Sequence, residues 1–523
     1  MRKQGIFPAA LNRGKIIKKG GAFWRYINKS DELYIFWATL TYYIVSTANI
    51  NNKTIFISLL ILWVIYNLRL KNIRQSLLLT ALASLVFLVG KTWTVELISP
   101  KLLRSTDFPL GYIAFIVVTP FQYFSSLIAV FLSRDVLFNY FDMRRKVLKL
   151  LSNPTVMVLC LFFLWQIVSA VMAENIYNIA FISSLQSLSY LVVLIGLLSY
   201  FAMDHSYVQK IVSQLGAITI FQTLLSGAQW LRRSTLGLAI EATEETLTYF
   251  KGPGQGFFSI RSLGTFSHPN ELALFSASMA LLFLPFVYLS PKQLTMQRNY
   301  YLGFFGAAVF ILMVSLGRSA WLSFLICLLV FLFFVEKKWD QHIVRLDKPN
   351  AKKLIYGAVL ILTMSPMIIS RAAGSFDLFK PTGGGETRLK LMKESFDLIN
   401  LKPLFGSGMG LSGYEMFKTN PKGIISTFPS VVHNLYLLIA NESGLPALAA
   451  FLLFISFILR EAIGSLKGMN IGRKTMVLGP LMALIVFLVN GMTNQVFLTG
   501  IFLITTSVLL MTMGRQSLSQ KKR

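Results

Sequence analysis

The chain has 523 residues, of which 54% are hydrophobic and only 14% are charged, and its formal net charge is +28 at pH 7. Apolar runs of roughly fifteen to twenty-five residues recur along its length, and about twenty such residues cross a bilayer as a helix. This composition excludes a soluble globular protein, and the lack of short alternating strands excludes a transmembrane barrel. The expected fold class is all-α: a polytopic integral membrane protein with about 12–14 transmembrane helices.

Fourteen apolar runs are predicted spans, of which the second and the ninth are short. They lie near 33–50, 54–68, 76–95, 110–132, 154–173, 180–201, 211–230, 269–289, 300–316, 319–335, 354–371, 433–459, 475–492 and 496–513. The chain then divides into a basic N-terminal segment (1–32), N-terminal transmembrane helices (33–230), an outer loop (231–268), central transmembrane helices (269–371), a large outer loop (372–432), C-terminal transmembrane helices (433–513) and a tail (514–523).

The distribution of basic residues predicts the orientation. With the N-terminus in the cytoplasm, the inner segments hold 33 of the 50 Lys and Arg residues, as the positive-inside rule expects. Most of the other 17 lie in the two long loops, which are then outside. Basic clusters such as 144–146 and 521–523 are best interpreted as anchors to anionic lipid, so no nucleic-acid partner is expected. Cys160 and Cys327 lie in separate spans and indicate neither a disulfide nor a metal site.

The first long outer loop ends in RSLGTFSHPNELALF. Arg261 lies close to the membrane without an obvious carboxylate neighbour in sequence, so it is a candidate for binding an anion. His268 and Asn270 flank a proline at the start of the next span, and proline is common in the first turn of a helix. These two residues are therefore either caps, which is the more ordinary interpretation, or accessory residues of a site.

The segment SLGRSAWLSF separates two central spans by a minimal outer turn. Arg318 in this turn lies at or just below the membrane surface. Its side chain either reaches lipid phosphate as an anchor or points inward at a bound anion. The sequence favours neither interpretation.

The second long loop contains a basic amphipathic helix of roughly four turns, typical of a helix in the plane of the membrane interface. Its predicted apolar stripe consists of Leu389, Met392, Phe396 and Ile399. Arg388 lies one turn before Met392, so we expect it to be held against the protein. A GxGxG turn follows, and Gly408 within it has a backbone N–H that could approach an anion, although this signal is weak.

The span at 433–459 begins with a His-Asn pair on the outer side. Nearby arginines disfavour a second positive charge, so the pKa of His433 should fall below its ordinary value and leave a neutral imidazole that can act as a base. Asn434 is a possible accessory residue. Glu442 lies about 13 Å deeper along the helix, too far to contact His433 directly. With its neighbours it is expected to form a polar break before Gly444, and it could line a cavity.

Taken in order, the segments RSLGTFSHPNELALF, SLGRSAWLSF, GETRLKLMKESFDLINLKPLFGSGMG and HNLYLLIANESGLPAL resemble the O-antigen ligase and polymerase family, over roughly residues 255–460. Members are bacterial inner-membrane glycosyltransferases whose donors are glycans on undecaprenyl diphosphate. The resemblance implies that His433 is the base and that Arg261, Arg318 and Arg388 engage the donor diphosphate. It implies three partners: the bilayer, the lipid-linked donor, and a glycan, lipid or protein acceptor. It also implies a multi-pass protein of the cytoplasmic membrane, with both termini inside and the active face outside.

Elementary chemistry agrees with that implication. Diphosphate is already a good leaving group, so the reaction mainly requires fixed cations that stabilise developing negative charge, and arginine suits this role. We expect an inverting, single-displacement transfer without a metal or cofactor, since no DxD motif is present. The alternative is a transporter of a small anion or solute. It is disfavoured because the spans hold almost no mid-depth charge other than Glu442. A non-catalytic scaffold would not require basic groups gathered on one face.

Overall fold

The computed structural model describes residues 31–48, 52–86, 91–94, 115–173, 177–201, 205–241, 249–251, 258–288, 295–339, 384–428, 430–466, 471–494, 505–510 and 512. The predicted span at 354–371 lies outside these residues. So do most of the span at 496–513, nearly all of the N-terminal segment and the whole C-terminal tail.

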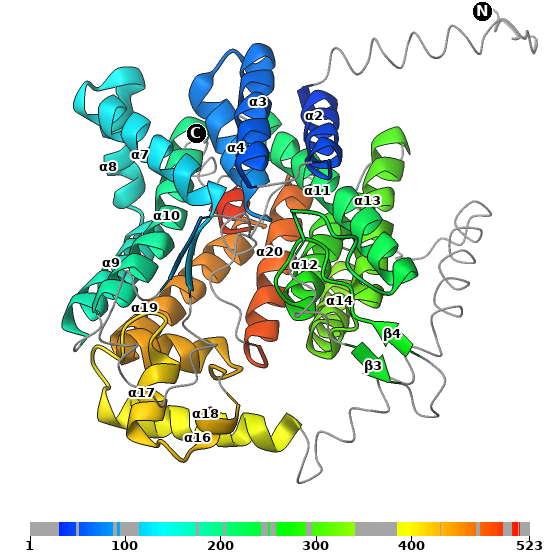
Figure 1. Cartoon of the computed structure of the whole chain (residues 1–523). Coiled ribbons are helices and arrows are strands. Elements are labelled where there is room, and N and C mark those ends of the chain that lie inside the picture. Colours follow the sequence, from blue (N-terminus) through cyan, green and yellow to red (C-terminus); the bar gives the residue numbers. More distant parts are fainter. Residues whose placement is uncertain are drawn as a thin grey trace, which may run out of the picture.

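Two groups of helices make up the described protein (Figure 1). The N-terminal group consists of α2 (Asp31–Ser46), α3 (Asn52–Leu70), α4 (Ile73–Ser84), α7 (Pro120–Leu137), the 3₁₀ turn η2 (Tyr140–Asp142), α8 (Met143–Leu151), α9 (Pro154–Met172), α10 (Tyr177–Phe201) and α11 (His205–Arg232). The second group consists of α12 (Pro269–Tyr288), α13 (Thr295–Val314), α14 (Arg318–Trp339), α16 (Gly384–Leu401), α17 (Ser412–Thr419), α18 (Ile424–Thr427), α19 (Leu435–Ser465) and α20 (Ile471–Gly491).

Seven of the described helices are long and apolar enough to cross a membrane, and two shorter apolar helices accompany them. The seven are Lys53–Leu70, Pro154–Met172, Ile179–Phe201, Val208–Arg232, Pro269–Tyr288, Leu435–Ser465 and Lys474–Gly491, and the shorter two are Arg298–Val314 and Arg318–Phe333. Large apolar side chains such as Leu161, Leu164 and Val171 of α9 are exposed, as expected for residues that face lipid. The prediction of an all-helical, polytopic membrane protein is confirmed.

Two predicted spans differ from the structure in their extent. Helix α4 ends at Ser84, and the chain then forms strand β1 (Lys91–Thr94), which pairs antiparallel with β2 (Phe115–Val118) before α7 begins. The prediction of continuous spans at 76–95 and 110–132 is therefore wrong at these ends. The strands are rich in threonine, valine and aromatic residues, which favour extended backbone as readily as a span. A second small hairpin joins β3 (Tyr249–Lys251) to β4 (Phe258–Ile260).

Helix α12 is the central helix of the second group, and nearly all its side chains from Leu272 to Val287 are buried. It carries many small residues, among them Ala273, Ser276 and Ala277, which allow neighbouring backbones to come close. Helix α20 does so at Gly479, where an added Cβ would lie 2.5 Å from the carbonyl oxygen of Leu282. Close helix packing here fixes where the ends of α12 and α20 lie relative to each other.

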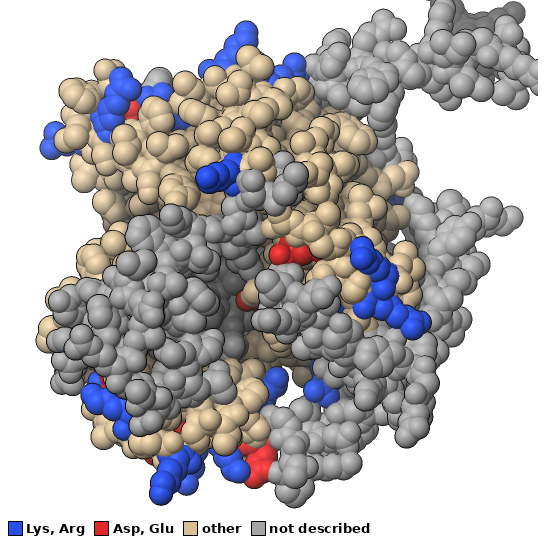
Figure 2. Space-filling view, viewed as in Figure 1, with Lys and Arg blue, Asp and Glu red and all other residues tan. Residues whose placement is uncertain are grey.

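Helices α16 to α18 form a layer across one end of the bundle, at the bottom of Figure 1, while α3 and α8 lie at the top. Figure 2 shows blue and red charged atoms over this layer, whereas the middle of the described surface is mostly tan. Asparagines start several helices by accepting backbone N–H groups, among them Asn72 for α4, Asn153 for α9 and Asn434 for α19. The described starts of α12, α14 and α19 all belong to the candidate site.

Candidate functional site

The turn after β4 is fixed by two glutamines of α11. Gln222 and Gln229 are seven residues apart and so project from one face of the helix. The Oε1 of Gln229 accepts the N–H groups of Leu263 and Gly264 at 3.1 and 2.8 Å. Gln222 accepts the N–H of Thr265 at 3.2 Å and donates to its hydroxyl at 2.6 Å. The Gly-Thr-Phe segment is therefore a rigid, buried turn rather than a solvated loop.

This turn holds Arg261 in a buried position beside α12. Its Nε donates to the carbonyl oxygen of Ser315, just after α13, at 3.2 Å. Its Nη2 donates to Oδ1 of Asn270, in the first turn of α12, at 2.5 Å. Both of these acceptors are neutral oxygens, so they orient the guanidinium without cancelling its charge.

His268 caps α12. Its Nδ1 accepts the backbone N–H of Asn270 at 3.0 Å, which agrees with the capping interpretation. Because Nδ1 accepts, a neutral ring carries its proton on Nε2. Although the residue retains exposed surface, partial desolvation by the surrounding protein, followed by the charges of Arg261 and His433, lowers the pKa of His268 to about 4.

Arg318 and Arg388 reach the site from two different helices. Arg318 is the first residue of α14, and Arg388 lies in the second turn of α16. Burial, and then the charge of Arg318, lowers the pKa of Arg388, so the two half-buried guanidinium groups lie near each other. Arg388 forms no ion pair with any residue that the structure describes.

The inward face of α16 differs from the predicted stripe. Leu389 and Phe396 are 67% and 52% exposed, whereas Leu391 and Ser395 are fully buried. The prediction of the apolar stripe is wrong at the first two residues, because the buried face follows contacts with α19 rather than the hydrophobicity of single residues. Arg388 lies three and seven positions before Leu391 and Ser395, so it shares the inward face, as expected.

His433 directly precedes the cap of α19. Its Nδ1 is buried without a hydrogen-bond partner in the described part of the chain, and its ring lies 6.3 Å from that of Phe428. Burial is the first cause that lowers the pKa of His433 to about 4, and the charge of Arg388 is the second, with the carbonyl of Val431 opposing them. The predicted direction agrees, although the sequence analysis named the arginines as the cause rather than burial.

The structure brings the four predicted cationic or titratable positions around His433 into one cluster. The charge of Arg261 acts on His268, that of His433 also acts on His268, Arg388 acts on His433, and Arg318 acts on Arg388. The starts of α12, α14 and α19 lie in the same place, and helix N-termini carry positive partial charge. Partly desolvated positive charges repel one another, so the cluster, which we call the cationic cluster, is suited to an anionic ligand.

Asn434 joins the cluster to α20. Its Oδ1 accepts the N–H groups of Tyr436 and Leu437, each at 3.0 Å, and its Nδ2 donates to the carbonyl oxygen of Met492 at 3.1 Å. It therefore both caps α19 and fixes the position of His433 relative to the end of α20.

The glycine turn faces α19 instead of open space. The N–H groups of Ser407 and Gly408 donate to the carbonyl oxygens of Asn441 and Glu442, each at 2.8 Å. The carboxyl Oε1 of Glu442 accepts the hydroxyl of Ser412 at 3.1 Å. These contacts give Gly408 and Glu442 structural partners in the fold.

The same contacts explain the break in α19. Gly444 has φ +81° and ψ 172°, so the helix is interrupted there, as the polar NES segment predicted. A Cβ at this position would lie 2.0 Å from the carbonyl oxygen of Leu404. The carbonyl groups freed by the break accept hydrogen bonds from Ser169 and Trp165, at 2.9 and 3.0 Å.

Sequence analysis missed several polar residues around the cluster, namely Ser319, Glu271, Asn490 and Asn494. Glu271, the acidic residue in the first turn of α12, accepts the hydroxyl of Ser267 at 2.7 Å. Asn490 and Asn494 end α20, in the segment VNGMTN. Two asparagines four residues apart at the outer end of an apolar span were the signal available in the sequence.

Comparison with known proteins agrees with this geometry. Residues 303–452 match the family model described as O-antigen ligase. The chain carries a domain of the O-antigen ligase family. The matched residues include Arg318, Arg388 and His433, whereas Arg261 and His268 precede them. This O-antigen ligase domain makes the protein a multi-pass membrane enzyme of the O-antigen ligase type. No curated protein gives a significant match to the sequence.

Proposed function

We propose that this protein transfers a glycan from an undecaprenyl-diphosphate carrier to an acceptor hydroxyl, on the outer face of the bacterial cytoplasmic membrane. The observation that carries the proposal is the convergence of Arg318 and Arg388 with His433 and His268 in one partly desolvated cluster. The acceptor is a lipid core, a growing glycan or a protein, all of which offer the same hydroxyl chemistry.

The donor diphosphate is held by Arg261, Arg318 and Arg388. Guanidinium groups bind phosphate oxygens in pairs, and Arg261 is already oriented by two neutral oxygens. The positive ends of α12, α14 and α19 add to this field. As the sugar–phosphate bond breaks, negative charge grows on the diphosphate, and these fixed groups stabilise it most in the transition state.

His433 accepts the proton of the acceptor hydroxyl. The acceptor oxygen bonds to the anomeric carbon, the carbon–oxygen bond to phosphate breaks with its electron pair, and undecaprenyl diphosphate leaves; a single displacement inverts the anomeric centre. A base with a pKa of about 4 is weak, but a bound diphosphate places negative charge beside the ring. Donor binding therefore raises the pKa of His433 and strengthens the base only in the loaded enzyme.

The same charges supply the electrostatic help that a divalent cation gives in other transferases, so we propose that the reaction needs no metal. Transfer that is unchanged by a chelator supports this, and transfer that is lost with the chelator and restored by magnesium or manganese contradicts it.

The experiment is His433→Ala in proteoliposomes that contain an undecaprenyl-diphosphate glycan and a candidate acceptor. We expect transfer to fall by about a hundredfold to ten-thousandfold while donor binding persists, and added imidazole to restore part of the rate. Product stereochemistry is read by NMR, and retention of configuration would contradict a single displacement.

Asn153→Ala is the matched control, because Asn153 caps α9 away from the cluster. It should transfer normally once folded. Near-normal transfer by His433→Ala would exclude His433 as the base. Uptake of a solute by the same proteoliposomes without transfer would favour the transporter alternative.

A further inference from the structure

The end of α20 contacts the starts of three helices that carry the candidate catalytic residues. Asn494 donates through Nδ2 to the hydroxyl of Ser319, beside Arg318 in the first turn of α14, at 2.6 Å. Its Oδ1 accepts Nδ2 of Asn270, in the first turn of α12, at 3.5 Å. Met492, two residues earlier, accepts Nδ2 of Asn434 at the start of α19. One five-residue segment, Asn490–Asn494, thus links α12, α14 and α19.

The direction of every hydrogen bond in this chain is fixed by Arg261. A guanidinium only donates, so the atom of Asn270 that meets it must be Oδ1, and its Nδ2 faces Asn494. The atom of Asn494 that accepts is then Oδ1, which directs Nδ2 to Ser319 and to Oδ1 of Asn490 at 2.9 Å. The amide orientations therefore follow from chemistry and are not interchangeable.

Burial makes this chain of amides costly to break. Asn494 is 4% exposed and Asn490 is fully buried, and a buried polar group that loses its partner retains its full desolvation penalty. Helix α20 is itself held against α12 by the close approach at Gly479. The segment is therefore a rigid reference point and not a passive contact of the cluster.

We propose that Asn494 is a positioning residue, which sets the spacing between the cations of α12 and α14 and the base of α19. This inference rests on the proposed function, and it assigns Asn494 no contact with the substrate. It acts through Asn270 on Arg261 and through Ser319 on the start of α14. Because transition-state stabilisation depends on placement within about an ångström, a shift of one helix start reduces turnover more than it reduces donor binding.

The test measures kcat and KM separately for Asn494→Ala, Ser319→Ala and the double variant. We expect each single variant to lower kcat by roughly tenfold and to change KM by about twofold or less. The double variant should be no worse than the worse single variant, because both changes break the same link. Additive losses would show that Asn494 does not act through Ser319 and would overturn the proposal.

Asn153→Ala again serves as the control, since it removes an asparagine that likewise accepts two backbone N–H groups. Equal losses of kcat in Asn494→Ala and Asn153→Ala, at equal losses of thermal stability, would show a merely structural role and overturn the inference. Ser319→Ala removes one oxygen atom, so it keeps the test decisive if Asn494→Ala does not fold. Wild-type kcat in Ser319→Ala would then overturn it.

The inference and the proposed function fail in distinguishable ways. His433→Ala inactive with Asn494→Ala fully active refutes only the positioning role, whereas His433→Ala fully active refutes the proposed function itself.

Discussion

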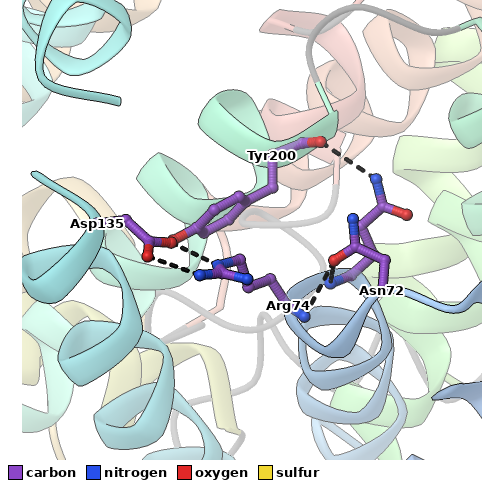
Figure 3. A network of polar contacts seen from close by, with 5 residues as sticks. Asn72, Arg74, Asp135 and Tyr200 are labelled. Atoms are coloured by element: carbon purple, nitrogen blue, oxygen red, sulfur yellow. Dashed lines mark hydrogen bonds and ion pairs between the residues drawn. The ribbon is translucent and has the colours of Figure 1, made fainter. Parts of the chain in front are cut away.

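Arginines at the two ends of the bundle have different partners. At the α3–α4 corner, Arg74 forms a two-pronged ion pair with Asp135, at 2.5 and 2.7 Å, and Tyr200 donates to the same carboxylate at 2.5 Å (Figure 3). At the opposite end, the hydrogen bonds of Arg261 go to a carbonyl and an amide oxygen. Buried guanidinium groups are thus present at both ends, but a carboxylate neutralises the one at the corner.

The same contrast extends to neighbouring charges. Asp31 is paired with both Arg69 and Lys210, each at 2.9 Å, so charge at the α3–α4 end is compensated within the fold. Arg388, in the cationic cluster, forms no ion pair with the described residues, and Arg318 disfavours its charge further. A paired arginine stabilises the protein, whereas a group of cations held by neutral oxygens keeps its charge for a ligand.

The largest effect expected from this contrast is on activity, at Arg388. Arg388→Ala should reduce transfer by about a hundredfold to a thousandfold, because a preorganised cation is lost from the diphosphate site. Arg388→Lys keeps the charge without the planar fork and should also lose much of the activity. Thermal stability of both variants should match or exceed that of the wild type, since a mutual repulsion is removed. Full activity of Arg388→Lys would indicate a simple point-charge role.

At the paired end the expected effect is on stability. Arg74→Ala leaves the fully buried carboxylate of Asp135 without its cation and should cost about 2–3 kcal/mol of unfolding free energy, reduced from the usual range because Arg74 is partly exposed. Unfolding in detergent measures the loss, and transfer per folded molecule should remain unchanged. Loss of transfer in fully folded Arg74→Ala would remove the functional difference between the two ends.

The smallest effect expected is the pH dependence of stability. The pKa of His433 is about 4 in the folded protein, against an ordinary value of 6.5, so between these values the unfolded chain binds more protons. The free energy of unfolding should therefore fall as the pH drops from 6.5 to 4, by about 1 kcal/mol after allowance for partial exposure. His433→Gln should flatten this dependence, measured as the thermal midpoint against pH. An unchanged slope in His433→Gln would show that the ring is not held neutral.

Much of this protein follows from its sequence alone. The length and spacing of apolar runs determine the membrane class and most of the helices, because a bilayer requires each span to satisfy its own backbone. The placement of Arg318, Arg388 and His433 at the ends of spans also identifies them as candidates. Asn434 and the break at Gly444 belong to the same local level, since caps and kinks depend on neighbouring residues.

Only the tertiary structure decided how these parts meet. The strands at 91–94 and 115–118, the inward face of α16 and the use of the glycine turn by α19 each depend on contacts between distant segments. The link from Asn494 to Asn270 and Ser319 joins three helices far apart in sequence. Local patterns fix where a helix starts, but its rotation and neighbours are set by packing, and those two quantities determine which polar groups share a site.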